Sequence, residues 1–190
     1  MTEDYTERDP IILMQRAKDG DGDAFGQLYH TYLIPVFRYI YFRIRDKDTA
    51  EDLTQDVFLK VYGAISRFEH KDTSPLAYFF TVARNTVIDY QRKKKTIPLD
   101  GDGTEAALAA LPDTAKHPEG TAEWRDTLKA LREAIGSLTE EQQEVVVLRF
   151  MGELSVREVA RLMQKAEPAV RQLQCRALRA LRGHSAFMRK

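Results

Sequence analysis

The sequence has 190 residues, enough for one large domain or two small ones. Its 29 basic and 29 acidic residues cancel and 43% of its residues are hydrophobic, so the composition excludes a disordered chain and names no partner. It has no apolar run that could cross a bilayer and no signal-peptide pattern, so we expect a cytoplasmic protein. Its four histidines are scattered and it has a single cysteine, so we expect no metal, cofactor, disulfide or catalytic centre.

Helical periodicity predicts three amphipathic helices before residue 66. The first is expected over residues 10–18. Asp23 is expected to cap the second, which Pro35 should kink or divide. Asp48 is expected to cap the third, over residues 49–65, which buries Leu53, Val57, Val61 and either Phe58 or Ala64. The outer face of this third helix is polar and comprises Glu51, Asp52, Gln55, Asp56 and Lys60.

A longer helix is predicted from Ser74, as its N-cap, to Lys95, with Pro75 at its first position. Its apolar side comprises Leu76, Phe79, Phe80, Ala83, Val87 and Tyr90. Its opposite side comprises Tyr78, Thr81, Asn85, Asp89 and Arg92, and the helix ends in four consecutive basic residues. An aromatic ring, an amide and a cationic end suit a nucleic acid, although an ordinary helix with a solvated face gives the same pattern.

A linker is predicted over residues 96–120, because prolines and glycines interrupt it and acidic residues outnumber basic ones. A second helical unit follows, with helices over 124–135 and from Thr139 to Gly152. The capping box Ser155–Glu158 then opens a short helix, which a tight turn separates from a last helix.

This last helix, from Pro168 to about Arg182, completes a helix-turn-helix arrangement. From Arg161 onward the chain has eight basic residues and one acidic residue. The side chains expected to face away from the core are Arg171, Gln172, Cys175, Arg176 and Arg179. Arginine and glutamine there can contact base edges and phosphates of DNA. We therefore predict an all-α protein with a helical bundle over 9–95 and a helix-turn-helix domain over 121–186.

Two groups of segments resemble a known family. AFGQLYHTY, AEDLTQDVFLKVY and FEHKDTSPLAYFFTVARNTVIDYQRKKK resemble, in order, the second conserved region of the extracytoplasmic-function (ECF) sigma factors of bacterial RNA polymerase. SLTEEQQEVVVLRFMGELSVREVARLM followed by AVRQLQCRALRALR resembles the fourth region. The resemblance implies a non-enzymatic subunit that binds core RNA polymerase at the β′ clamp helices and the β flap, directs it to promoter DNA and assists promoter melting. It also implies an anti-sigma factor as a partner, and neither a small-molecule substrate nor membrane insertion.

The resemblance also assigns roles to individual residues. Core polymerase would bind Asp52, Gln55 and Asp56. The minus-ten element would bind Phe68, Tyr78, Asn85, Asp89, Arg92 and Lys93. The minus-thirty-five element would bind Arg171, Gln172, Cys175, Arg176 and Arg179. In the family, a base flipped from the duplex enters a pocket beside the surface that binds the minus-ten element. For the ring of Phe68, packing in the core is an equally good alternative to contact with that base.

The chain departs from the family pattern at a few positions. Tyr78 stands where tryptophan is usual, and Gln164 and Ala166 stand where the turn usually has glycine and serine, so Glu167 is expected to act as a weak cap. The usual basic and apolar residues are exchanged at Leu173–Gln174, which leaves the rotation of the last helix open.

Three other functions remain open. The chain could be a stand-alone helix-turn-helix regulator that dimerises through its N-terminal bundle, or a sigma-mimicking interaction module that uses no DNA. An enzyme is the remotest alternative, because no nucleophile, base or metal set converges in the sequence.

Overall fold

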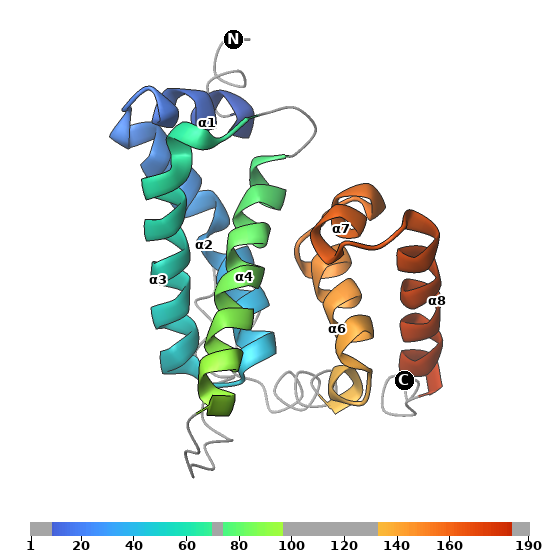
Figure 1. The fold of residues 1–190 in the computed structure, drawn as a ribbon. Coiled ribbons are helices and arrows are strands. Elements are labelled where there is room, and N and C mark those ends of the chain that lie inside the picture. The colour runs from blue at the N-terminus through green and yellow to red at the C-terminus, as the bar shows by residue number, and fades with distance from the viewer. Residues whose placement is uncertain (1–8, 70–73, 97–132, 184–190) are drawn as a thin grey trace, which may run out of the picture. The chain divides into compact units, whose positions relative to one another are not determined.

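The computed structural model describes residues 9–69, 74–96 and 133–183. Every regular element in these ranges is helical, which confirms the all-α prediction (Figure 1). The chain divides into two compact units, Met1–Gly103 and Thr104–Lys190, which are described one after the other. The predicted linker lies outside the described residues except for Thr96, so its boundaries stay predictions.

Helix α1 (Pro10–Lys18) has the predicted bounds, and Asp9 caps it by accepting a hydrogen bond from the amide two residues on (2.8 Å). Helix α2 (Gly22–Ile44) is capped by Asp21, whose Oδ1 lies 3.0 Å from the amide nitrogen of Ala24. The prediction that Asp23 caps this helix was wrong, because Asp23 already lies in the first helical turn. Its carboxylate can only complement the positive end of the helix dipole from that position.

Helix α2 continues without a break through Pro35, so of the two predicted outcomes, a kink or a division, the division was wrong. Proline removes one hydrogen bond of the helical ladder, but α2 packs against α1, α3 and α4, which offsets that loss. The helix ends at its C-cap, Arg45, which takes a left-handed conformation with φ 62°.

Helix α3 (Lys47–Ala64) is capped by Asp46, which accepts a hydrogen bond from the amide of Thr49 (2.9 Å). The predicted cap, Asp48, lies in the first turn instead, so that prediction was wrong. The predicted inner face is confirmed, with Phe58 as the fourth buried side chain, and comprises Leu53, Val57, Phe58 and Val61. A short 3-10 helix, η1 (Ile65–Arg67), follows directly.

Helix α4 (Pro75–Thr96) begins as predicted, with Ser74 Oγ accepting a hydrogen bond from the amide of Ala77 (3.2 Å). Helices α2, α3 and α4 run side by side, and α1 lies across one end of them (Figure 1). The core between them is rich in aromatic rings: Phe79 lies 5.0 Å from Tyr32 and 5.2 Å from Phe58 between ring centroids. Buried aromatic pairs of this kind contribute packing beyond their apolar area, which makes α4 a rigid platform for its outer face.

The second unit contains α6 (Glu140–Val146), the π-helical turn η3 (Val147–Met151), α7 (Val156–Met163) and α8 (Glu167–Gly183). Two reciprocal capping boxes fix its helix starts, Thr139 with Gln142 and, as predicted, Ser155 with Glu158. A small apolar cluster ties α6 to α8 and comprises Leu138, Val146, Ala177 and Leu181.

The tight turn between α7 and α8 uses a strained residue. Gln164 adopts a left-handed conformation (φ 55°, ψ 43°), although it carries a side chain. Helix α8 begins at Glu167, so the prediction that Glu167 caps it was wrong; the carbonyl of Ala166 accepts the first helical hydrogen bonds instead. The chain therefore makes the usual turn of a helix-turn-helix without the usual glycine.

Candidate functional site

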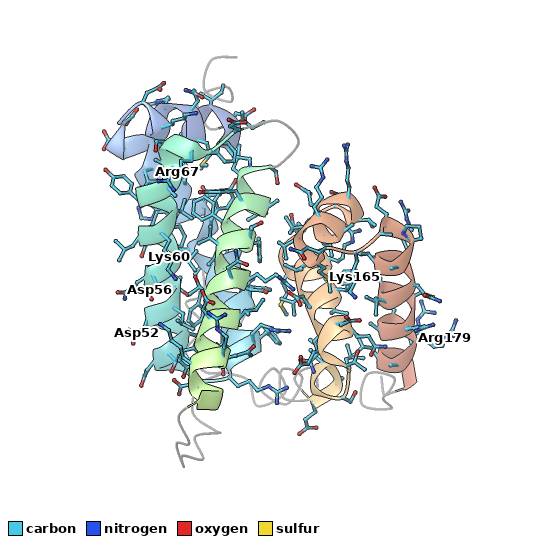
Figure 2. The ribbon with its side chains drawn as sticks, in the orientation of Figure 1. Asp52, Asp56, Lys60, Arg67, Lys165 and Arg179 are labelled. Carbon is cyan, nitrogen blue, oxygen red and sulfur yellow. The ribbon has the colours of Figure 1, made fainter. Side chains whose placement is uncertain are left out.

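One candidate surface is an acidic and amide stripe on the outer face of α3. Asp52, Gln55 and Asp56 are all exposed, and their spacing of three and four residues places them on one side of the helix. Figure 2 shows Asp52 and Asp56 along the edge of α3. The stripe presents negative charge that no ion pair among the described residues neutralises, so it suits a basic protein partner.

Two large apolar side chains extend this stripe, and sequence reasoning missed them. Leu59 is 69% exposed and lies three residues after Asp56, and Tyr62 is 56% exposed and lies three residues after Leu59. The ring of Tyr62 meets that of Phe25 from α2, with centroids 4.9 Å apart. An exposed apolar patch beside charged residues is typical of a protein-binding surface, and the helical spacing alone could have revealed it.

Lys60, which was predicted on the outer face, has a structural contact. Its Nζ donates a hydrogen bond to Oγ1 of Thr86 on α4 (3.0 Å), and Thr86 is only 4% exposed. Lys60 therefore satisfies a buried hydroxyl and links α3 to α4, so its charge is directed away from the acidic stripe.

A second candidate surface begins at Phe68 and Tyr78. Phe68 is 7% exposed, and its ring meets that of Tyr78 edge to face with centroids 5.2 Å apart. Tyr78 is half-buried; desolvation raises the pKa of its phenol, and the nearby cation of Arg67 partly offsets this. The ring of Tyr78 is therefore neutral and partly exposed, and the buried ring of Phe68 packs against it.

The outer face of α4 continues from Tyr78 in a polar stripe. Asn85, Asp89, Arg92 and Lys93 are all exposed, as predicted. Asp89 Oδ1 lies 3.1 Å from Arg92 Nη2, in an ion pair that is exposed on both sides and contributes little to stability. An open ring, an amide and cations follow one another along this stripe, so it can stack a base, hydrogen-bond its edge and attract phosphate.

A third candidate surface is the outer face of α8. Its predicted residues are all exposed and comprise Arg171, Gln172, Cys175, Arg176 and Arg179. Arg171 is held by Glu167 one turn earlier (Nη2 to Oε2, 2.9 Å), whereas Arg176 and Arg179 form no ion pair within the described part of the chain. Arg179 projects away from the helix (Figure 2). These free cations suit the phosphates and base edges of a DNA groove.

A contact between η3 and α8 settles the rotation of α8. Arg149 Nε donates to Oε1 of Gln174 (3.3 Å), and the same guanidinium donates to the carbonyl of Leu154. Gln174 is thus directed toward η3 and is half-buried, while Leu173 beside it is also half-buried. The exchange of residues at these two positions therefore leaves the exposed face of α8 as the sequence predicted.

The described ranges contain no group of three or more histidine, cysteine, aspartate or glutamate residues that could hold a metal ion. Nor do they contain a helix long and apolar enough to span a membrane.

Comparison with known families gives two matches. Residues 28–97 match the model for sigma-70 region 2, and residues 128–181 match the model for sigma-70 region 4. The two matches together cover more than half of the chain and fall on the first and the second compact unit, respectively.

Two curated relatives of the chain are ECF RNA polymerase sigma factors. The chain is 38% identical over 169 residues to the ECF RNA polymerase sigma factor BldN of Streptomyces coelicolor, a match that covers 89% of this chain but only 63% of BldN. It is 28% identical over 169 residues to the ECF sigma factor SigX of Bacillus subtilis, with 88% of this chain and 87% of SigX covered.

Two solved structures share the fold. CnrH, solved in complex with the cytosolic domain of CnrY, matches with a TM-score of 0.66 and 22% identity over 92% of this chain and 94% of CnrH. The sigma factor RpoE of Bartonella quintana, solved with the anti-sigma factor NepR, matches with a TM-score of 0.64 and 20% identity over 84% of this chain and 95% of RpoE.

Proposed function

The chain belongs to the ECF group of sigma-70 factors, and from this premise we propose that it is an alternative sigma factor, which binds core RNA polymerase, directs it to specific promoters and assists their melting. The observation that carries the proposal is that both sigma regions occur in order on one chain, each in its own helical unit. Sigma factors perform no bond chemistry themselves, so the chain acts as a specificity subunit in the cytoplasm, where the polymerase works.

The polymerase docks on the stripe of α3. Asp52, Gln55 and Asp56 bind the basic β′ clamp helices, and Leu59 and Tyr62 add apolar area to the same contact. Charge complementarity speeds and orients such an encounter, while the apolar side chains supply most of the area removed from water. The second unit contacts the β flap.

The minus-ten element binds the outer face of α4. The open ring of Tyr78 stacks on an unpaired base of the non-template strand, and the amide of Asn85 bonds to a base edge. Asp89 orients Arg92, and Arg92 and Lys93 attract the phosphates. Phe68 supports Tyr78 from the core side and does not itself stack on a base, because its ring is buried.

The minus-thirty-five element binds α8 through the major groove. Arg171, Gln172, Cys175 and Arg176 lie within the first ten residues of α8 and contact base edges, and Arg179 binds phosphate further along the helix. The helix-turn-helix geometry of α7 and α8 and their exposed cations support this assignment.

An anti-sigma factor regulates the chain. The Bartonella quintana RpoE was solved with the anti-sigma factor NepR and CnrH with the cytosolic domain of CnrY, and the exposed stripe on α3 offers a surface that a protein partner can cover. Competition for that stripe would keep the chain from core polymerase.

Run-off transcription with purified core polymerase, followed by mapping of the start sites, tests the proposal. The chain is expected to produce discrete transcripts that core polymerase alone does not produce. A chain that represses or activates transcription only with another sigma factor present would instead be a stand-alone regulator.

A further inference from the structure

Lys18, the last residue of α1, makes a contact that links distant parts of the first unit. Its Nζ donates a hydrogen bond to the backbone carbonyl oxygen of Phe68 (3.1 Å), fifty residues further along the chain. Both groups are partly shielded from water, and an ammonium donor makes such a bond stronger than a neutral one. Helix α1 lies before the segment that matches sigma-70 region 2, so the family model assigns Lys18 no role.

The end of α1 is well placed to hold this contact, because its junction with α2 is fixed. Arg16 Nη2 lies 2.8 Å from Oδ2 of Asp21, and the same aspartate caps α2. These hydrogen bonds and the charge of Arg16 lower the pKa of Asp21, so the ion pair persists at neutral pH. Lys18 therefore projects from a corner that is fixed on both sides.

The acceptor of this bond, the carbonyl oxygen of Phe68, belongs to the residue whose ring packs against Tyr78 on α4. Phe68 follows η1 directly in an extended conformation, and its amide is held by the carbonyl of Ile65 (3.0 Å). Its ring is the one that meets Tyr78 edge to face. The Lys18 bond is thus a tertiary hydrogen bond that holds the backbone of Phe68, whose ring contacts Tyr78.

We propose that Lys18 is a positioning residue for capture of the minus-ten strand: it holds Phe68 in place against Tyr78, so that the open ring of Tyr78 is ordered before a base arrives. The proposal rests on the function proposed above. Preorganisation of this kind lowers the entropy lost on binding without adding a contact to DNA. Loss of Lys18 should therefore weaken strand capture and leave the docking of core polymerase unchanged.

The test compares Lys18→Met, which keeps the length and loses the donor, with Lys18→Arg, which restores one. Lys47→Met is the matched charge control, because within the described ranges the ion pair of Lys47 is with the exposed Glu51 (3.6 Å). The measurement is the affinity of each holoenzyme for a single-stranded oligonucleotide, with the minus-ten sequence of a start site that the wild type uses. We expect Lys18→Met to bind about five-fold more weakly, as expected for loss of one charged hydrogen bond with partial compensation. Lys18→Arg and Lys47→Met should stay near wild type, and all variants should bind core polymerase equally.

Hydrogen exchange of the free chain provides a readout that needs no DNA. In Lys18→Met, the amides of Phe68 and Tyr78 should exchange faster, while those in the middle of α3 stay protected. Faster exchange throughout α1–α4 would show a merely structural role and overturn the proposal, as would an unchanged oligonucleotide affinity. If the wild-type holoenzyme fails to bind the oligonucleotide, the proposed function itself fails, and the exchange data show separately whether Lys18 orders Phe68.

Discussion

The ring of Tyr78 on α4 meets the ring of Phe68 edge to face, with centroids 5.2 Å apart, and only Tyr78 remains partly open to solvent. This arrangement divides the work between the two residues: Phe68 fills the core and Tyr78 offers a stacking surface. We predict that Tyr78→Ala weakens minus-ten strand binding by the holoenzyme by about 1–3 kcal/mol, the usual contribution of one base–aromatic stack. Oligonucleotide binding measures the effect.

Tyr78→Phe is the control for that experiment. Because burial raises the pKa of Tyr78, the phenol is neutral at physiological pH and the hydroxyl adds no charge to the stack. The phenylalanine variant should therefore bind the oligonucleotide as tightly as the wild type does. The two affinities should depend on pH in the same way between pH 6 and pH 9, because this range lies roughly one to four pH units below the ordinary tyrosine pKa. Equal loss in Tyr78→Phe and Tyr78→Ala would contradict the stacking role.

The acidic stripe on α3 predicts a charge effect on polymerase binding. Asp52→Lys combined with Asp56→Lys should weaken binding of core polymerase by about ten-fold or more, and the loss should shrink as salt is raised. Asp19→Lys is the control, since Asp19 is also an exposed carboxylate of the first unit but lies at the end of α1, outside α3. Fluorescence titration of labelled core polymerase measures the wild type, the double variant and the control, and equal weakening in the control would remove the stripe as the docking surface.

The cations of α8 should divide into two classes. Arg176→Ala should relax sequence preference at one position of the minus-thirty-five element, at a loss of about 1–3 kcal/mol for the preferred base. Arg179→Ala should weaken binding to all sequences alike and reduce the slope of log affinity against log salt by about one. Holoenzyme binding to a panel of promoter variants at several salt concentrations separates the two effects, and identical profiles would contradict the assignment.

The left-handed turn at Gln164 predicts a stabilising substitution. Gln164→Gly should stabilise the second unit by about 0.5–1 kcal/mol, because glycine removes the steric cost of φ 55°, partly offset by its larger entropy when unfolded. Gln164→Ala should give no such gain, since alanine also carries a Cβ atom. Calorimetric unfolding of the two variants distinguishes them; equal melting temperatures would show that the turn is not strained.

Tyr32 predicts how the first unit responds to alkaline pH. Burial, with a smaller contribution from the charge of Asp9, raises the pKa of Tyr32 to about 12. The unfolded chain therefore loses its proton from pH 10 upward while the folded chain keeps it, so stability should fall as the pH rises between about 10 and 12. Tyr32→Phe should be less sensitive in this range, as followed by circular dichroism; identical alkaline transitions would contradict the buried neutral phenol.

Local patterns were sufficient to predict most of the helices and their exposed faces. The start of α4 at Ser74 and the capping box at Ser155 depend on residues three positions apart, and the outward faces of α3 and α8 depend on helical spacing. Two caps were misplaced by two residues each, at Asp21 and Asp46. In each case a second aspartate two residues later could equally have accepted the hydrogen bond, and only the backbone conformation decides between them.

Contacts between distant residues could not be predicted in this way. The burial of Phe68 has no periodic signal, because the residue lies after a short 3-10 helix and packs on a ring ten residues later. The bond from Lys18 joins residues fifty positions apart, and that from Arg149 to Gln174 joins residues 25 apart. These contacts arise from packing of whole helices, and they determine which ring or guanidinium is available to a partner.

The most direct test of the central claim is promoter binding by the chain with and without core polymerase. A labelled duplex that spans a mapped start site is titrated, at one fixed salt concentration, with the chain, with core polymerase and with both. We predict specific binding that resists competitor DNA only when both proteins are present. Equally tight and specific binding by the chain alone, in particular as a dimer on a palindromic site, would contradict the account.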